Sequence, residues 1–152
     1  MPRALYRGQV IVAVTARIAD RQPVFADSDI VHVFVELLKI AADKHSGRVP
    51  IYCFMPDHVH VVLEGQTSGA DTWRSMVTFK QQSGLWLSRH VGARWQKDFF
   101  DHIIRADEDV AAQIRYVANN PVRKGLVSDW RSYPFTGAIG YDLHAVIDRA
   151  TT

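Results

Sequence analysis

Hydrophobic and polar residues alternate along the chain in blocks that predict four strands. Residues 9–18 are rich in Val and Ile, and residues 49–55 and 58–64 form two apolar runs separated by a Pro-Asp turn. Apolar runs of this length between turn residues are typical of strands, and two of them joined by a short turn predict a hairpin. Residues 99–105 predict a fourth, shorter strand.

Apolar residues at helical spacing predict two helices between these strands. The first begins at Asp27 or Ser28, which are both good N-cap residues, and Gly47 is expected to stop it. Its apolar face consists of Ile30, Phe34, Leu37 and Ala41. The second helix opens within residues 67–71 and runs to about Arg89.

A third helix begins at the acidic residues 107–109, where the positive end of the helix dipole favours negative charge. Its apolar stripe consists of Val110, Ile114 and Val117. Pro121 is expected to end this helix, because the residue before a proline avoids the α region. Residues 142–152 are weakly patterned and are expected to form a loosely docked or frayed tail.

The order strand, helix, strand, strand, helix, strand is that of a ferredoxin-like fold. The sequence therefore predicts an α+β protein with the βαββαβ order, an antiparallel sheet, helices mainly on one face of it, and an additional C-terminal helix. A chain of 152 residues with 47% apolar residues is long enough for one domain with a real core. We expect a single domain over residues 1–141, followed by the tail.

Composition indicates in which compartment the protein is expected. No apolar stretch reaches the length of a membrane span, and the N-terminus has a basic start without a long apolar run. The single Cys53 cannot form an internal disulfide and lies in an apolar run, so it is expected to be a buried small side chain. We expect a cytoplasmic protein without a membrane partner.

Charge is unevenly distributed along the chain, although the net charge is only +2. Residues 74–105 contain six Lys/Arg against two Asp, whereas residues 26–46 are more acidic than basic. Such asymmetry can mark a face that binds a polyanion. On charge alone, an ordinary solvated surface explains it better.

Candidate chemistry begins with His58 and His60, which flank Val59 at the start of a predicted strand. Side chains two apart in a strand point to the same face, so both imidazoles can reach one metal ion while Val59 points into the core. Histidines in strands are also commonly hydrogen-bonded core or surface residues. A metal site would need a third ligand and a nucleophile from elsewhere in the chain.

The third predicted helix offers both. Tyr116 and Asn120 are spaced i, i+4 and share one face, to the side of the apolar stripe. Asn120 has a carbonyl oxygen, which makes it a candidate third ligand. A phenol with its ordinary pKa of about 10 becomes a useful nucleophile when a cation polarises the electrophile. Attack on a phosphodiester would give a phosphotyrosine that keeps the bond energy, as DNA strand transfer requires.

Three segments of the chain resemble the HUH single-tyrosine transposases of small insertion sequences, and especially the REP-associated tyrosine transposases. They are residues 54–60 (FMPDHVH), 95–105 (WQKDFFDHIIR) and 114–127 (IRYVANNPVRKGLV). They occur in the family's order, and the resemblance extends over roughly residues 9–135.

The resemblance implies that His58 and His60 are metal ligands, that Tyr116 is the nucleophile, and that Asn120 is the polar residue one turn after it. Family members use Mg²⁺ or Mn²⁺ and cleave single-stranded DNA, commonly beside a hairpin, leaving a 5′-phosphotyrosine and a free 3′-hydroxyl. Asp57 departs from the family, where Asn is common. An extra carboxylate there could strengthen metal binding or change the preferred ion, and imidazole ligands alone favour zinc or other transition metals.

Single-stranded or hairpin DNA is the partner that the resemblance implies, and with it a cytoplasmic, nucleoid-associated location. The candidate DNA-binding residues are Arg74, Lys80, Arg94, Trp95, Lys97, Arg105, Arg123 and Lys124. Trp95, between Arg94 and Lys97, is the best candidate for base stacking. His102 is expected to be structural or to support the site. Insertion-sequence relatives work as dimers, and REP-associated relatives can act as monomers, so a homodimer is one of two expected states.

Two other functions are compatible with these residues. One is a domesticated hairpin-DNA-binding protein with little turnover, although pure binding needs none of His58, His60 and Tyr116. The other is a metal-dependent phosphoesterase that activates water, with Tyr116 incidental. Independently of these functions, Tyr116 could pack its ring at the rim of the core, and Asn120 could be only a residue near the helix C-terminus. A DNA-linked protein band on a denaturing gel would separate strand transfer from both.

Overall fold

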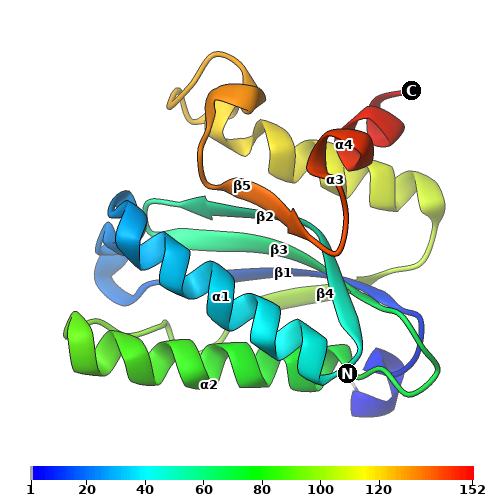
Figure 1. The fold of residues 1–152 in the computed structure, drawn as a ribbon, viewed down its shortest axis with the longest axis horizontal. Helices are drawn as coiled ribbons and strands as arrows, with labels where there is room; N and C mark the ends of the chain where they lie inside the picture. Colours follow the sequence, from blue (N-terminus) through cyan, green and yellow to red (C-terminus); the bar gives the residue numbers. More distant parts are fainter. Residues whose placement is uncertain (1) are drawn as a thin grey trace.

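The computed structural model describes residues 2–152 and contains five strands and four α-helices (Figure 1). In chain order the elements are β1 (Ile11–Arg17), α1 (Ser28–Lys44), β2 (Gly47–Met55), β3 (His58–Gly65), α2 (Thr72–His90), β4 (Phe100–Ile104), α3 (Asp107–Arg123), β5 (Thr136–Ile139) and α4 (Leu143–Thr151). Short 3-10 helices lie at Arg3–Tyr6, Ala19–Arg21, Val24–Ala26 and Trp130–Ser132.

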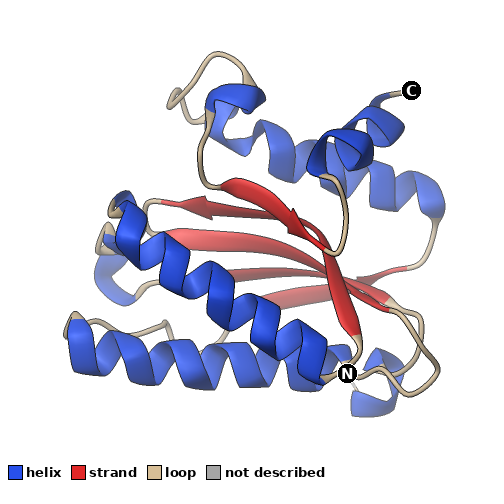
Figure 2. Cartoon of the chain, viewed as in Figure 1, coloured by secondary structure: helices blue, strands red, loops and turns tan. Residues whose placement is uncertain are grey.

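The strands form one antiparallel sheet in the order β4-β1-β3-β2-β5 (Figure 2). Helices α1 and α2 cover one face of the sheet, and α3 and α4 lie on the other face (Figure 1). The α+β, ferredoxin-like prediction is confirmed. Helices were expected mainly on one face of the sheet. Instead they are divided equally, because α4 joins α3 on the face opposite α1 and α2.

Two hydrophobic clusters occupy the two faces of the sheet, and β3 contributes to both. Val59, Val61 and Leu63 pack with α1 and α2, whereas Val62 packs with α3 and α4. Successive strand residues point to opposite faces. His58 and His60 therefore share the face of Val62, beneath α3.

Local capping explains where the first two helices begin. The Asp27 side chain accepts a hydrogen bond from the Asp29 backbone N–H, and the Asp71 side chain accepts one from the Arg74 N–H. Each bond satisfies one of the free N–H groups of the first turn. The N-cap of the first helix is thus Asp27, one of the two predicted residues.

The structure differs from the sequence prediction at three places near the C-terminus. Pro121 lies inside α3, which continues to Arg123, so the prediction that it ends the helix is wrong. The fixed φ of proline is compatible with a helix, and the loss of its N–H and the crowding of its ring against the preceding turn fall in the last turn of α3. Strand β5 pairs with β2 and was not predicted. Residues 142–152 are not a weakly patterned tail: they contain α4, capped by Asp142, and its Ile147 is buried.

No helix within residues 2–152 combines the length and the apolar character needed to cross a membrane.

Candidate active site

His58 and His60 lie side by side where β3 begins, just after the turn that joins it to β2. Their ring centroids are 4.9 Å apart and the rings are nearly perpendicular. Both side chains are buried, with less than a tenth of either residue exposed. The prediction that the two imidazoles share one face of the sheet, toward the helix with Tyr116, is confirmed.

Each imidazole has its Nδ1 atom held by a neighbouring oxygen. His58 Nδ1 lies 2.6 Å from Asp57 Oδ1, and His60 Nδ1 lies 3.0 Å from Thr15 Oγ1. Thr15 stands directly opposite His60 in the β1–β3 ladder. Histidines that bind metal usually hold one ring nitrogen in this way, which fixes the ring and leaves the other nitrogen for the ion. Nε2 is that remaining nitrogen on both rings.

Electrostatics favours the neutral form of both imidazoles. Burial lowers the pKa of His58, and the adjacent Asp57 carboxylate only partly opposes this. Burial, together with the charges of His58, Arg17 and the helix end at Arg123 and Lys124, lowers the pKa of His60 to about 3. A neutral imidazole has a free lone pair, as a metal ligand requires.

Tyr116 projects from α3 over this pair. Its ring is perpendicular to the His60 ring, with centroids 5.8 Å apart, and 49% of the residue is exposed. The Arg123 guanidinium carbon lies 4.1 Å from the Tyr116 ring centroid, and Arg123 also donates a 2.7 Å hydrogen bond to the Tyr116 backbone carbonyl. The phenol is thus placed beside the histidines and under a cation.

Asn120, one turn after Tyr116, is buried at 2% exposure. Its Oδ1 accepts a 3.3 Å hydrogen bond from Arg123, and its buried Nδ2 has no hydrogen-bond partner within residues 2–152. A buried amide with one unpaired end is unusual, because such a group loses its water without compensation. A half-turn of the amide would bring Oδ1 to the unpaired position, but it would place the Nδ2 donor against the Arg123 guanidinium, which is also a donor.

The donor set fits a divalent cation in part. Two neutral imidazoles with free Nε2 atoms and one incompletely paired amide are present. Within the described chain, no three His, Cys, Asp or Glu side chains gather closely enough to form a site by themselves. An ion held by this face would therefore use the two imidazoles, the amide oxygen of Asn120, and ligands from substrate or water.

Three cations surround the histidines. Arg17 stands opposite His58 in the β1–β3 ladder, and Arg123 and Lys124 end the α3 helix. All three are exposed, and each lowers the pKa of His60 through its charge. Arg17 was missed in the sequence because only the strand register places it beside His58. This arrangement suits a phosphate group approaching Tyr116.

The predicted DNA-binding residues divide between two regions. Arg105 lines a groove between β4 and α3 that also includes Tyr116, and Arg123 and Lys124 adjoin the histidines. Arg74 and Lys80 are on α2, which packs on the opposite face of the sheet. Arg94 and Lys97 lie in the segment that follows α2.

The α2 cations already have partners within the protein. Arg74 forms an ion pair with Asp71 at 3.6 Å. Lys80 donates a 3.1 Å hydrogen bond to the Lys97 carbonyl and lies over the Phe99 ring, and burial lowers its pKa. The structure therefore does not bring these residues to Tyr116.

The expectation that Trp95 stacks on bases is wrong. Trp95 is buried at 7% exposure among Phe25, Phe34 and Phe79, and its Nε1–H donates a 2.9 Å hydrogen bond to Ser83 Oγ. The ring packs in the hydrophobic core and its Nε1–H already has a hydrogen-bond partner, so neither is available to a base. A tryptophan flanked by basic residues in sequence can thus be entirely structural.

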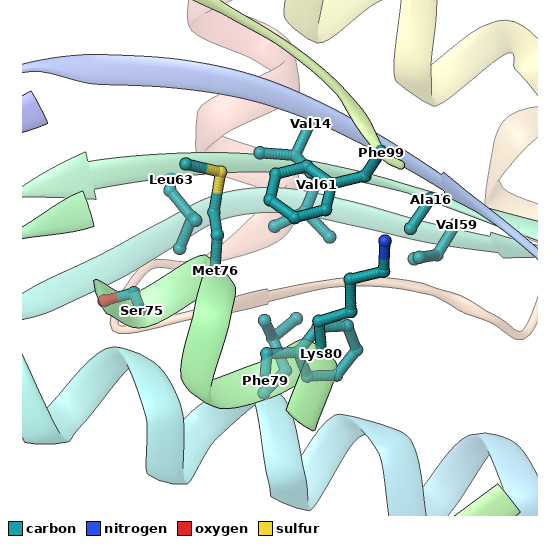
Figure 3. Close-up of a pocket in the computed structure, with 11 residues that line it drawn as sticks. Val14, Ala16, Val59, Val61, Leu63, Ser75, Met76, Phe79, Lys80 and Phe99 are labelled. Atoms are coloured by element: carbon teal, nitrogen blue, oxygen red, sulfur yellow. The ribbon is translucent and has the colours of Figure 1, made fainter. Parts of the chain in front are cut away.

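A small cavity lies on the other side of the sheet, under α2 (Figure 3). Its volume is about 20 Å³, and its lining is almost wholly apolar, with Val61, Met76, Phe79 and Phe99 among the walls. This space could hold about one water molecule, but it offers few polar partners for one. It is a packing gap and not a second site.

Comparison with known proteins covers the histidines, Tyr116 and Asn120 of this site. The family model described as "Transposase IS200 like" matches residues 8–120, a range that includes both histidines, Tyr116 and Asn120. A protein of Haemophilus influenzae described as a REP-associated tyrosine transposase is 22% identical over 121 residues, which cover 72% of this chain and 69% of that protein. The REP-associated tyrosine transposase of Escherichia coli K12 is 26% identical over 104 residues, which cover 66% of this chain and 59% of that protein.

The fold has also been seen in solved structures. A REP-associated tyrosine transposase bound to a REP hairpin superposes with a TM-score of 0.74 at 18% sequence identity. The match covers 86% of this chain and 78% of that one. At this identity the likeness concerns the fold.

Proposed function

The chain belongs to the family of IS200-like transposases, as its three motifs predict, and we propose that it cleaves and rejoins single-stranded DNA beside a hairpin with Tyr116 as the nucleophile. One observation carries the proposal. The exposed phenol of Tyr116 stands 5.8 Å, centroid to centroid, from a buried neutral imidazole, and three cations surround the same spot. Core packing alone needs neither the free Nε2 atoms nor the cations.

The reaction follows from the groups present. The Tyr116 Oη attacks the phosphorus of a DNA phosphodiester, a new O–P bond forms, and the bond from phosphorus to the 3′-oxygen breaks. The phenol loses its proton and the departing 3′-oxygen gains one. The product is a 5′-phosphotyrosine with a free 3′-hydroxyl, and attack by a 3′-hydroxyl on that linkage rejoins a strand and regenerates Tyr116.

The chain's own residues have three tasks in this scheme. Arg123 holds the Tyr116 ring by stacking on it and places a positive charge beside the developing phenolate. Arg17 and Lys124 neutralise the phosphate that is attacked. Thr15 and Asp57 hold the Nδ1 atoms of the two imidazoles, which leaves both Nε2 atoms available to a ligand.

A divalent cation, Mg²⁺ or Mn²⁺ by the family resemblance, would be held by His58, His60 and the amide oxygen of Asn120, and it would act as a Lewis acid on the phosphate oxygens. The neutral imidazoles support this assignment. Asn120 would contribute Oδ1 once the hydrogen bond from Arg123 to that atom is released.

A second function is favoured by one contact. Arg123 donates a hydrogen bond to Asn120 Oδ1, which is the atom that the cation would use. If this contact persists with DNA bound, the protein would recognise a hairpin, as the hairpin-bound structural relative does, but would turn over little. With the same hairpin DNA, strand transfer gives a covalent protein–DNA adduct, whereas binding alone gives only a non-covalent complex.

The test is a denaturing gel with a hairpin oligonucleotide that carries single-stranded flanks and a label on either end. Strand transfer gives a labelled protein band that resists denaturation and disappears after protease treatment. Cleaved ends without a protein adduct would overturn Tyr116 as nucleophile in favour of activated water. A mobility shift without cleavage at any Mg²⁺ or Mn²⁺ concentration would support the binding protein.

A further inference from the structure

The edge strand β4 presents an aromatic side chain that the core does not use. Phe100 is 71% exposed, the highest value among the large hydrophobic residues of the described chain. The preceding residue, Phe99, is partly buried against the α1–α2 core beneath Lys80. Packing thus accounts for one phenylalanine of this pair and leaves the other in solvent.

Strand register places Phe100 on the face that carries the histidines. Phe100 is directly opposite Thr15 on β1, and Thr15 is directly opposite His60 on β3. Residues opposite one another in a ladder point to the same face, and neighbouring strands lie about 4.8 Å apart. The Phe100 ring therefore stands roughly 10 Å from His60 on the same surface.

A groove runs from Tyr116 along β4. It lies between β4 and α3, and its lining includes His102, Arg105, Gln113 and Tyr116. His102 is next to Phe100 on the same face of β4, with ring centroids 6.4 Å apart. The groove thus begins at the proposed nucleophile and continues beside His102, with Phe100 adjacent to it, and its walls also carry an arginine, an amide and the Asp109 carboxylate.

These groups are the ones that bind unpaired nucleotides. Aromatic faces stack on bases irrespective of sequence, and arginine neutralises the backbone between them. The groove opens on the phosphate that Tyr116 would attack, so its occupant is continuous with the substrate of the proposed reaction.

We propose that Phe100 is a stacking platform for an unpaired base of the DNA strand adjoining the phosphate attacked by Tyr116, and that the β4–α3 groove, with Arg105, carries the backbone of that strand. This inference rests on the proposed function and adds a single-stranded subsite to it. It replaces Trp95, which is buried, as the base-stacking residue.

The experiment measures binding without chemistry, in the Tyr116→Phe background and without divalent metal. Hairpins are made with a single-stranded flank, and 2-aminopurine replaces one flank base at a time. Binding should quench the fluorescence at one flank position, because stacking on an aromatic ring quenches this base. The same hairpin without a flank serves to measure the affinity that the flank adds.

Three variants separate stacking from other roles of Phe100. Phe100→Ala should abolish the quenching and weaken binding of the flanked hairpin about 5-fold to 100-fold, the range for loss of one base–aromatic stack, while leaving the hairpin without flank unaffected. Phe100→Leu keeps an apolar side chain and should also lose the quenching, whereas Phe100→Trp should retain it. Leu85→Ala is the matched control, because Leu85 is 48% exposed on α2, across the sheet.

Other outcomes overturn the inference. Equal affinity of wild type and Phe100→Ala for the flanked hairpin would show that no base rests on this ring. A change from dimer to monomer in sedimentation, with flank affinity unchanged, would show that Phe100 on the edge strand contacts a second copy of the chain. Quenching in the Tyr116→Phe background, combined with no DNA adduct from the wild-type protein on the denaturing gel, would leave the subsite standing and remove the proposed chemistry, so the two failures are distinguishable.

Discussion

The Tyr116 ring stands at 89° to the His60 imidazole, with their centroids 5.8 Å apart. Tyr116 comes from α3 and His60 from β3, so the pair forms only when α3 packs against that face of the sheet. Buried residues Ile114 and Val117 of α3 and Val62 of β3 belong to the cluster that makes this contact. The geometry of the candidate nucleophile is therefore set by core packing.

Replacing Tyr116 by phenylalanine should abolish cleavage and adduct formation while preserving hairpin binding. The residue is half-exposed and its hydroxyl makes no hydrogen bond within residues 2–152, so the free energy of unfolding should change by less than about 0.5 kcal/mol. Chemical denaturation and a denaturing gel measure the two effects separately.

Tyr141→Phe is the matched control for that variant. Tyr141 is also exposed, and its hydroxyl contacts Glu64 away from the histidines. Cleavage by this variant should equal that of wild type. If Tyr116→Phe cut DNA at a comparable rate, the water-activating phosphoesterase would become the better interpretation.

Removing either imidazole should abolish metal binding. His58→Ala and His60→Ala each delete one free Nε2, and calorimetric titration with Mn²⁺ should show no saturation at concentrations that saturate wild type. Excess Mn²⁺ should restore a trace of cleavage to these variants and none to Tyr116→Phe. His32→Ala, on the exposed face of α1, should bind and cleave normally.

Thr15 should act as a positioning residue for His60. Thr15→Val keeps the shape but removes the oxygen 3.0 Å from His60 Nδ1, and loss of such a support typically weakens metal affinity 10-fold to 100-fold. Thr15→Ser should restore the affinity, because the hydroxyl returns. Equal Mn²⁺ affinity in the valine and serine variants would show that the contact does not orient the ring.

Strong base should destabilise the protein through Tyr6. Burial and the hydrogen bond to Asp101 raise the pKa of Tyr6 to about 12, and this bond ties the N-terminal segment to β4. Between pH 10 and 12 the unfolded chain has lost this proton and the folded chain keeps it, so the free energy of unfolding falls as pH rises. Denaturation curves over this range should show a smaller fall for Tyr6→Phe than for wild type.

The sequence predicted those parts of the site that depend on local periodicity. His58 and His60 share a face because strand side chains repeat every two residues, and Tyr116 and Asn120 share a face because of the helical i, i+4 spacing. Periodicity alone does not show that the strand with the histidines and the helix with Tyr116 lie together. The family motifs supplied that part of the prediction.

The remaining parts depend on tertiary contacts. Arg17 meets His58 only through the β1–β3 register, and Trp95 is buried because Ser83 and three phenylalanines surround it. Strand β5 is four residues long and pairs with β2 across an irregular register, so it has little pattern of its own. The α4 helix is short, and the local signals that it carries, the Asp142 N-cap and buried apolar residues at helical spacing, were overlooked in the sequence.

Binding of hairpin DNA should fall steeply with salt, and Arg17 and Arg74 should contribute differently to that slope. Each phosphate contact releases condensed counterions, so loss of one contact lowers the salt slope by about one and weakens binding to all sequences alike. Arg17 has no acidic partner within 4.0 Å in the described chain and faces the histidines, whereas Arg74 is paired with Asp71 on the opposite side of the sheet. Arg17→Gln should therefore reduce both affinity and slope, and Arg74→Gln should change neither.

Fluorescence anisotropy of a labelled, flanked hairpin over a range of NaCl concentrations measures both quantities, with a plain duplex of equal length as the weaker competitor. A larger effect from Arg74 than from Arg17 would move the DNA to the α2 face, as the charge pattern of residues 74–105 suggests, and would separate DNA binding from the face that carries Tyr116.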